Sequence, residues 1–346
     1  SLAVTEGIGF KTGQRDKGQK LMFIDIRRAY FHSPARRKVY VRLPPEDSEP
    51  GYCGILEKSM YGTRDAAQNW EHHYASVMEK LGFRRGAAVS CLFYHADRQV
   101  RVGIHGDDFT ILGAKESLDW FQKELSKEFE LKVRGIIGPG KSDDKSIRLL
   151  NRVFEWTPEG IIWEADQRHA EIIVEQLGLN GRTKSLSTTG AKPTEVNEEE
   201  ITQEDATQYR ALVARANYMS QDRSDVQFAV KELCRGMAKP TEEDWNKLKH
   251  LGRYLVNKIR HRSIYQYQSI TSEITVTTDT DYAGCYKTRK STSGGMIQVG
   301  RHAIKTWSTT QSVVSLSSGE AEYYGMVRGA AQAIGIRSML SDIGIK

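Results

Sequence analysis

Three aspartates stand where the hydrophobic pattern predicts that strands end. The apolar run at 21–24 favours a buried strand that ends at Asp25. Alternating apolar residues over 99–112 predict antiparallel strands around a turn, which places Asp107 and Asp108 at the tip of a hairpin. Acids from separate strands that meet at one point of a sheet suit Mg²⁺, because this ion prefers oxygen ligands. Two such ions about 4 Å apart can activate an attacking hydroxyl and neutralise a leaving pyrophosphate in nucleotidyl transfer.

By itself, an Asp-Asp pair at a turn is more often a solvated turn filler, so the surrounding elements matter. A strand at 91–95 precedes the hairpin, and an amphipathic helix at 115–130 follows it. This order of strands and helices indicates an α+β fold. Beyond residue 160 the patterns predict helices at 165–177, 206–220, 226–239 and 241–258, then strands at 274–279, 295–299, 302–307 and 312–316, and a last helix at 319–342.

The composition is that of a folded chain with more than one core. The chain has 346 residues, 27% of them charged and 39% hydrophobic, with a net charge of +6. No apolar run approaches the roughly 18 residues of a membrane span. The four cysteines are scattered and form no CxxC pair, which argues against a disulfide framework or zinc site. The sequence begins without Met, so we expect a fragment of a longer, non-secreted protein that acts inside the cell, in a cytoplasmic particle or the nucleus.

The charges are unevenly distributed along the chain. Residues 195–205 carry six acids and no base, which is typical of a linker and leaves the remainder with a net charge of +12. Two stretches, 27–42 and 247–262, carry only basic charges. Such blocks attract phosphates, although each one taken alone could equally be ordinary solvated surface.

Nine motifs in collinear order span essentially the whole chain. They are DIRRAYF at 25–31, SMYGTRDAAQNW at 59–70, HGDD at 105–108, YRALV at 209–213, RSDVQFAV at 223–230, LGRYL at 251–255, TDTDYAG at 278–284, RKSTSG at 289–294 and LSSGEAEY at 316–323. Together they resemble the reverse transcriptase and ribonuclease H of copia-type retrotransposon Pol polyproteins.

The resemblance implies roles for individual residues of the polymerase part. Asp25 and Asp107 match the principal metal-binding acids, and Asp108 matches their partner. Tyr30 falls where related polymerases place a ring that excludes a ribose 2′-hydroxyl; its alternative is an ordinary core or strand-edge aromatic. The segment that lies under the templating base pair is matched by Gly62, Ala66 and Ala67. The two basic stretches, rather than the resemblance, supply the residues expected to bind nucleic acid: Arg36, Arg37, Lys38, Lys249, Arg253 and Lys258.

For the ribonuclease H part, the resemblance implies that Asp279 and Glu322 are catalytic acids, with Asp281 as a second choice. Asp279 could otherwise be a solubilising residue on an edge strand. Hydrolysis of RNA with two metal ions needs about four carboxylates, so we expect a truncated, inactive ribonuclease H domain.

The sequence also departs from the family pattern. His105-Gly106 replaces a Tyr-Val pair, Ala67 replaces a proline, and Arg28 stands where retroviral relatives often have an acid. The basic N-terminal fingers segment of the family is not found. We expect these departures in a divergent branch, with weakened binding of the nucleotide.

Four parts and one leading function follow from the resemblance. The expected parts are a palm with partial fingers (1–135), a thumb (136–190), an acidic linker with a helical connection (191–262) and the truncated ribonuclease H-like domain (263–346). The leading function is RNA-directed DNA polymerase, with Mg²⁺ or Mn²⁺ as cofactor and an RNA or DNA template, a primer and deoxynucleoside triphosphates as partners. The alternatives are a degenerate remnant that binds nucleic acid without catalysis and a purely structural interaction module.

Overall fold

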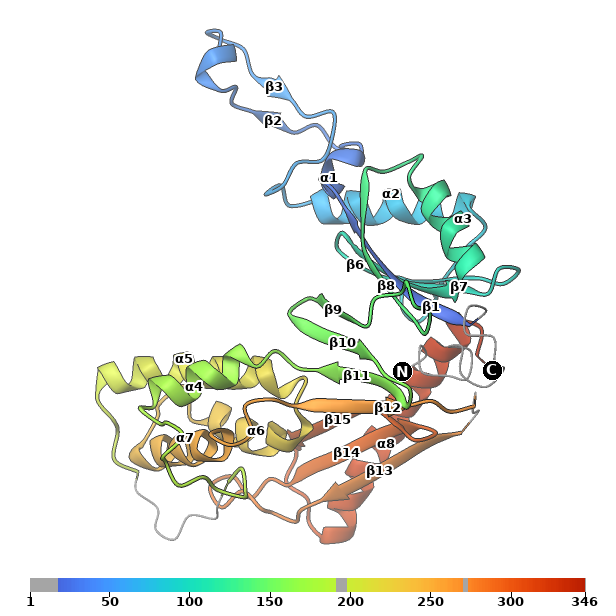
Figure 1. Cartoon of the computed structure of the whole chain (residues 1–346). Helices are drawn as coiled ribbons and strands as arrows, with labels where there is room; N and C mark the ends of the chain where they lie inside the picture. Colours follow the sequence, from blue (N-terminus) through green and yellow to red (C-terminus); the bar gives the residue numbers. More distant parts are fainter. Residues whose placement is uncertain (1–17, 191–197, 270–272, 346) are drawn as a thin grey trace. The chain divides into compact units, whose positions relative to one another are not determined.

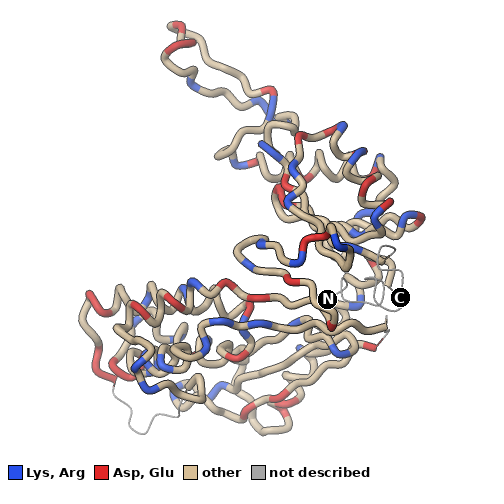
Figure 2. The backbone as a smooth tube through the Cα atoms, viewed as in Figure 1, with Lys and Arg blue, Asp and Glu red and all other residues tan. Residues whose placement is uncertain are grey.

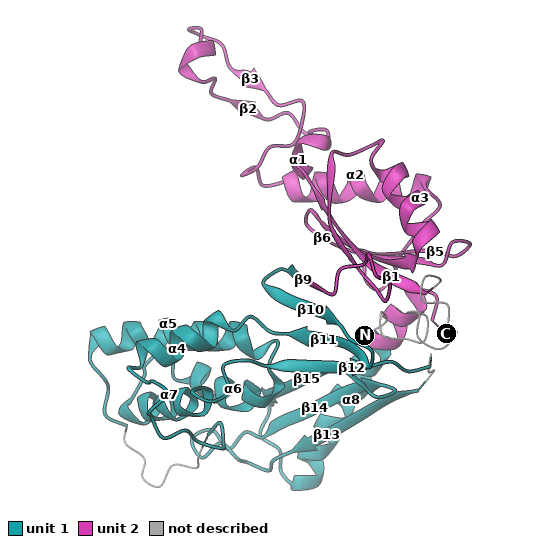
Figure 3. Ribbon diagram, viewed as in Figure 1, with its two compact units in different colours: residues 1, 148–334 teal, residues 2–147, 335–346 magenta. Residues whose placement is uncertain are grey.

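The computed structural model describes residues 18–190, 198–269 and 273–345, which form two compact units (Figure 3). One unit comprises residues up to 147 together with 335–346, and the other comprises 148–334. The three expected parts after residue 135 therefore do not separate at 190 and 262. Most of their residues share the second unit, and the end of the chain belongs to the first.

A six-stranded antiparallel sheet forms the centre of the first unit (Figure 1). Helices α2 (Ala66–Lys80) and α3 (Lys115–Leu125) pack with it around one buried cluster that includes Trp70, Phe109 and Phe121. In spatial order the strands are β4 (Arg84–Arg85), β5 (Leu92–His95), β6 (Val100–His105), β7 (Asp108–Ala114), β1 (Gln19–Ile26) and β8 (Leu131–Ile137).

Strand β1 lies inside the six-stranded sheet, and its apolar residues are buried. It pairs with β7 on one side and β8 on the other, and residues Leu21 to Ile24 are at most 7% exposed. A continuous apolar run is what a strand buried on both faces requires. The predictions of this strand and of the strands around the 105–108 turn are confirmed.

Helix α1 and a small ribbon extend from the six-stranded sheet, which is the sheet of the expected palm and is named the palm sheet below. Arg28 adopts a left-handed conformation (φ 51°, ψ 43°), which turns the chain from β1 into α1 (Ala29–His32). A two-stranded ribbon of β2 (Tyr40–Val41) and β3 (Gly54–Ile55) follows, with the 3₁₀ turn η2 (Pro45–Asp47) between its strands. In Figure 1 this ribbon projects away from the six-stranded sheet of the same unit.

The last residues of the chain pack on the edge of the palm sheet. The Asp342 carboxylate accepts hydrogen bonds from the backbone N–H groups of Ala88 (2.7 Å) and Val89 (3.2 Å). Arg101 Nε donates to the Ile343 carbonyl at 2.9 Å. These bonds explain why residues 335–346 group with the first unit.

The second unit holds two further sheets and a helical layer. A four-stranded sheet has the order β12 (Arg262–Gln266), β11 (Gly160–Glu164), β10 (Arg152–Trp156) and β9 (Ser146–Leu149). The helical layer comprises α4 (Arg168–Gln176), α5 (Gln203–Ser220), η3 (Ser224–Val226), α6 (Gln227–Arg235) and α7 (Glu242–Leu255). A three-stranded sheet of β13 (Ile274–Thr280), β14 (Thr292–Val299) and β15 (His302–Thr310) follows, with most of α8 (Ser318–Asp342).

The prediction of a strand at 312–316 is wrong. These residues form the turn that caps α8 instead: Ser317 Oγ accepts from the Glu320 N–H at 3.1 Å, and the Glu320 carboxylate accepts from the Leu316 N–H at 2.7 Å. The pattern Ser-x-x-Glu is a capping signature, and the apolar residues Val313 and Val314 concealed it.

Arg223 ties the helical layer together from inside the second unit. It is 1% exposed, forms a forked ion pair with Asp225 (2.7 Å), and donates to the Lys258 carbonyl at 2.6 Å. Burial raises the pKa of Asp225, but Arg223 and the Tyr254 hydroxyl outweigh this effect, so the pKa lies below its ordinary value. This carboxylate is therefore stabilised by its partners while ionised.

We expect Arg223→Ala to lower the free energy of unfolding by about 3 kcal/mol, because it removes a fully buried guanidinium and leaves the half-buried Asp225 carboxylate without its main partner. Lys239→Ala is the matched control: it removes a cation from an exposed pair with Glu200 in the same unit and should cost under about 1 kcal/mol. Urea denaturation measures both. Equal losses in the two variants would contradict the assigned role of Arg223.

Candidate active site

The pairing of β1 with β7 places two of the predicted acids opposite each other. Asp25 and Asp108 are direct cross-strand partners in this antiparallel ladder. Residues opposite each other on neighbouring strands project from the same face of the sheet. The third acid, Asp107, is exposed at the tip of the β6–β7 hairpin, and its carbonyl accepts from the Ile26 N–H at 3.0 Å. The structure thus brings all three predicted acids to one end of the six-stranded sheet.

A tryptophan from α2 anchors the hairpin tip. Trp70 is 1% exposed, and its indole Nε1 donates to the Gly106 carbonyl at 2.8 Å. Gly106 has a φ of +64°, a conformation that suits glycine at this tight turn. The last residue of the 59–70 segment therefore holds the turn that carries Asp107 and Asp108. The sequence did not predict this contact.

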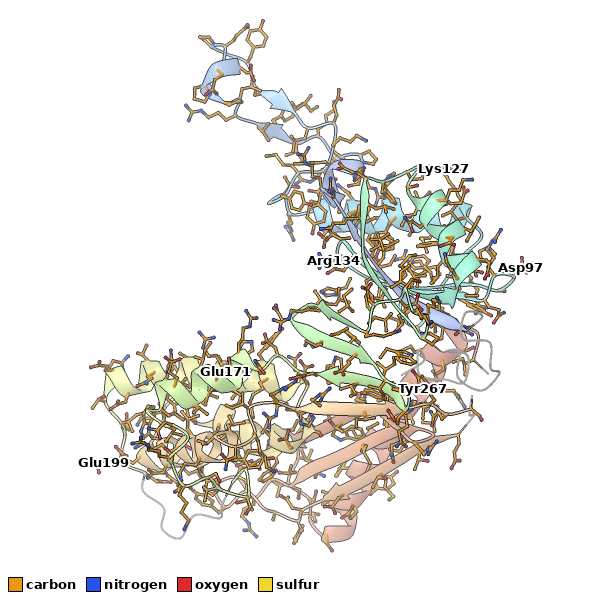
Figure 4. The ribbon with its side chains drawn as sticks, viewed as in Figure 1. Asp97, Lys127, Arg134, Glu171, Glu199 and Tyr267 are labelled. Carbon is orange, nitrogen blue, oxygen red and sulfur yellow. The ribbon has the colours of Figure 1, made fainter. Side chains whose placement is uncertain are left out.

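Arg134 of β8 is the partner of the acids that sequence reasoning missed. Its Nη2 lies 2.5 Å from Asp25 Oδ1 and 3.4 Å from Asp108 Oδ1. Figure 4 labels this arginine on the palm sheet. The hydrogen bond to Asp25, together with the charges of Asp108 and Asp107, raises the pKa of Arg134 against the effect of burial. The acids therefore face a permanent cation from a third strand.

Asp108 is the acid whose ionised form is opposed by burial and by neighbouring like charges. Its side chain is 9% exposed, and its Oδ1 atom accepts no hydrogen bond from the residues that the structure describes. Burial raises the pKa of Asp108; Arg134 opposes this rise, while the like charges of Asp107 and Asp25 add to it, and the net shift is upward. A buried, under-satisfied carboxylate oxygen of this kind has capacity for another cation or donor.

The three acids suit a divalent ion by type but do not form a closed metal site. Among residues 18–190, 198–269 and 273–345, no group of three or more His, Cys, Asp or Glu side chains is arranged to hold a metal ion. In its place, the Arg134 guanidinium balances the charge of Asp25 and Asp108. The assignment of Asp25, Asp107 and Asp108 as metal ligands stays a prediction.

Tyr30 lies beside the site and is held by a second tyrosine. Its ring stands 4.4 Å from that of Tyr61, tilted by 33°, and the Phe31 ring meets Tyr61 edge-on at 5.5 Å. Tyr30 is partly buried against the palm core, whereas Tyr61 is 48% exposed. Tyr30 thus contacts both the core and Tyr61, and its role as a ring that excludes a 2′-hydroxyl stays a prediction.

The predicted template-contacting residues differ in their exposure. Gly62 has a φ of +90° and open space around it, so its conformation explains the glycine. Ala67 is exposed at the start of α2, but Ala66 is 1% exposed and packs inside the palm core. Gly62 and Ala67 are thus accessible to a template in this structure, and Ala66 is not.

The predicted nucleic-acid-binding residues are exposed in each unit, except that Arg253 is half-buried. Figure 2 shows where the two basic stretches lie along the backbone. Arg36, Arg37 and Lys38 are exposed after α1, where Arg37 pairs with Asp65 at 3.0 Å. On and just after α7, Lys249 and Lys258 are exposed and lie over the rings of Trp245 and Tyr254, while Arg253 donates to the Lys184 carbonyl.

The two predicted ribonuclease H acids are on opposite sides of β13. Thr278 and Thr280 face α8, which approaches the strand closely through Gly329 and Gly325. Side chains alternate along a strand, so the exposed Asp279 points away from the helix that carries Glu322. Asp281 instead accepts from the Thr292 N–H at 2.7 Å. The described residues of this domain therefore bring none of these acids together.

We expect Asp108→Asn to stabilise the fold at neutral pH. The folded-state pKa of Asp108 is raised, so its ionisation begins to oppose folding as the pH rises above the ordinary aspartate pKa and does so fully above the raised pKa; an amide removes this penalty. The gain should shrink as the pH falls below the ordinary aspartate pKa, where the acid is neutral in both states. Urea denaturation with a chelator at pH 7 and pH 3.5 measures the difference. Asp97→Asn, at the exposed β5–β6 turn, is the control; lower stability of Asp108→Asn at pH 7 would contradict the reasoning.

Comparison with known proteins agrees with the resemblance that the motifs indicate. Residues 15–138 match the family "Reverse transcriptase (RNA-dependent DNA polymerase)". The chain is 26% identical over 347 residues to the retrovirus-related Pol polyprotein from transposon RE2 of Arabidopsis thaliana, covering 96% of this chain and 22% of that protein. It is 24% identical to the retrovirus-related Pol polyprotein from transposon TNT 1-94 of Nicotiana tabacum, covering 93% of this chain and 24% of that protein.

One relative is shorter, and the match to this chain covers nearly the whole of it. The putative transposon Ty5-1 protein of Saccharomyces cerevisiae is 24% identical over 317 residues, covering 87% of this chain and 97% of that protein. The chain thus spans less than a quarter of the plant polyproteins it matches. Within the described residues, no helix is long and apolar enough to cross a membrane. The matched segment and these relatives thus make the chain similar to copia-type reverse transcriptases over almost its whole length.

Proposed function

We propose that the chain is the polymerase part of a retroelement Pol protein, an RNA-directed DNA polymerase that extends a primer on an RNA or DNA template. The observation that carries the proposal is the register that sets Asp25 opposite Asp108, beside the exposed Asp107, within the segment that matches the reverse transcriptase family. Cross-strand acids on the central strands of a palm are a rigid platform, because the backbone ladder on both sides of β1 holds their positions.

The protein's own groups supply orientation at this platform. Trp70 holds the hairpin tip through its hydrogen bond to Gly106, and Tyr30 follows Asp25 by five residues, in α1. Asp25, Asp107 and Asp108 would hold Mg²⁺ or Mn²⁺, and two such ions would supply charge neutralisation for nucleotidyl transfer. The exposed basic residues of each unit would contact the phosphates of a primer–template.

One observation favours a second function. Because Arg134 already pairs with Asp25 and lies 3.4 Å from Asp108, the chain could be a remnant that binds nucleic acid without making bonds. Primer extension and salt-sensitive binding of an RNA–DNA duplex, measured on one preparation, separate the two functions. Extension supports the polymerase, whereas binding without extension supports the remnant.

If the chain polymerises, Asp25→Asn and Asp107→Asn should each reduce primer extension by roughly a thousandfold, because each removes a charge from the acid platform. Asp97→Asn removes an exposed aspartate from the same sheet, at the far hairpin labelled in Figure 4, and should leave extension within about twofold. Duplex binding should persist in all three variants. Extension that survives Asp107→Asn would show that the acids are not catalytic.

If Tyr30 discriminates between sugars, Tyr30→Ala should increase ribonucleotide incorporation about tenfold or more relative to deoxynucleotides, because the ring no longer blocks the 2′-hydroxyl. Tyr30→Phe keeps the ring and should keep the discrimination. Single-nucleotide incorporation assays give both ratios. An unchanged ratio in Tyr30→Ala would return Tyr30 to the role of a core aromatic.

We expect no ribonuclease H activity, because Asp279 and Glu322 lie on opposite sides of β13. Incubation with a labelled RNA–DNA hybrid and Mg²⁺ or Mn²⁺ tests this directly. Cleavage by the wild-type chain that disappears in Glu322→Gln would prove the expectation wrong.

A further inference from the structure

Arg134 reaches the acids because of an irregularity in the sheet. In the β1–β8 ladder, Phe23 pairs with Gly135 and Ile24 pairs with Val133, so Arg134 is the extra residue of a β-bulge. A bulge breaks the local alternation and re-aims the side chain of the inserted residue. The position of Arg134 over two acids is thus built into the backbone of β8.

The guanidinium binds both acids with the same nitrogen. Nη2 lies 2.5 Å from Asp25 and 3.4 Å from Asp108, whose Oδ1 atom nevertheless accepts no hydrogen bond from the described residues. Asp108 is more than nine-tenths buried, whereas the Arg134 side chain is 38% exposed. The arginine can therefore leave toward solvent, but the carboxylate cannot.

We propose that Arg134 is a resident counter-ion that occupies the cation position between Asp25 and Asp108 and competes with divalent ions for these carboxylates. This inference rests on the proposed function, since it concerns the same acids. A divalent ion and a guanidinium cannot share the two oxygens without strong like-charge repulsion at this distance. Ion binding therefore requires the Arg134 side chain to move away from the acids. The apparent affinity for the ion equals the intrinsic affinity multiplied by the fraction of molecules in which Arg134 has released them.

Lys132 provides a matched control on the same strand. It is the cross-strand neighbour of Asp25 and is exposed, so Lys132→Gln removes one positive charge beside the acids. Unlike Arg134, Lys132 forms no ion pair with Asp25 or Asp108 in the described structure. A general effect of charge would act equally in both variants, whereas displacement of a bound counter-ion is specific to Arg134.

The experiment is a titration of the full chain with Mn²⁺ alone, in which the free ion is followed by its electron paramagnetic resonance signal. Arg134→Gln should bind Mn²⁺ about tenfold more tightly or better, and Lys132→Gln within about threefold of wild type. Arg134→Lys keeps the charge but loses the guanidinium fork, so its affinity should lie between wild type and Arg134→Gln. It also serves as the readout if Arg134→Gln does not fold. The tight binding of Arg134→Gln should disappear when Asp25→Asn is added.

Equal affinities of wild type and Arg134→Gln would overturn the proposal, as would tight binding that persists with Asp25→Asn. Primer extension with the same proteins separates this inference from the proposed function. Tighter Mn²⁺ binding without extension in any variant supports the counter-ion and counts against the polymerase. Extension whose Mg²⁺ requirement and Mn²⁺ affinity are both unchanged in Arg134→Gln supports the polymerase and overturns the counter-ion.

Discussion

The mutual repulsion of Asp25 and Asp108 is the constraint on which the rest of the palm depends. Antiparallel pairing of β1 with β7 holds two like charges opposite each other, and burial of Asp108 removes the water that would screen them. The fold opposes this cost from three directions. The ladders on both sides of β1 fix the backbone, Trp70 holds the hairpin tip, and Arg134 supplies the opposite charge. A site that accumulates negative charge in a protein of net charge +6 is thus stabilised locally rather than by the overall field.

Much of the palm could be predicted from the sequence because its signals are local. The apolar run of β1, the alternation in β6 and the Asp-Asp turn each encode their own element, and family motifs supplied the order. The capping box of α7 is equally local: Thr241 and Asp244 bond each other's backbone as their spacing suggests. The acids converge because β1 and β7 are adjacent in the sheet, a pairing that the resemblance implied and the periodicity alone did not.

The features that sequence reasoning missed depend on contacts between distant segments. Arg134 meets Asp25 across 109 residues, and it does so through a bulge that has no sequence signature of its own. The four-stranded sheet also depends on a distant pairing, because β12 pairs with β11 about 100 residues away in the sequence. Its strands are short and partly exposed, so their apolar residues give a weak sequence pattern. Residues 312–316 show the opposite error, since apolar side chains suggested a strand where the cap of α8 required a turn.

The same rule of side-chain alternation separates the two candidate catalytic regions. In the palm, Asp25 and Asp108 are directly paired, so their side chains must share a face of the sheet whatever the loops do. In the C-terminal domain, Asp279 is one residue out of phase with Thr278 and Thr280, which contact α8, so a helix acid such as Glu322 cannot approach it without a change in the strand. A shift of β13 by one residue would reverse every side chain of the strand and expose the groups that now pack on Gly325 and Gly329. The close helix–strand packing therefore opposes assembly of an acid pair there, whereas the palm ladder enforces one.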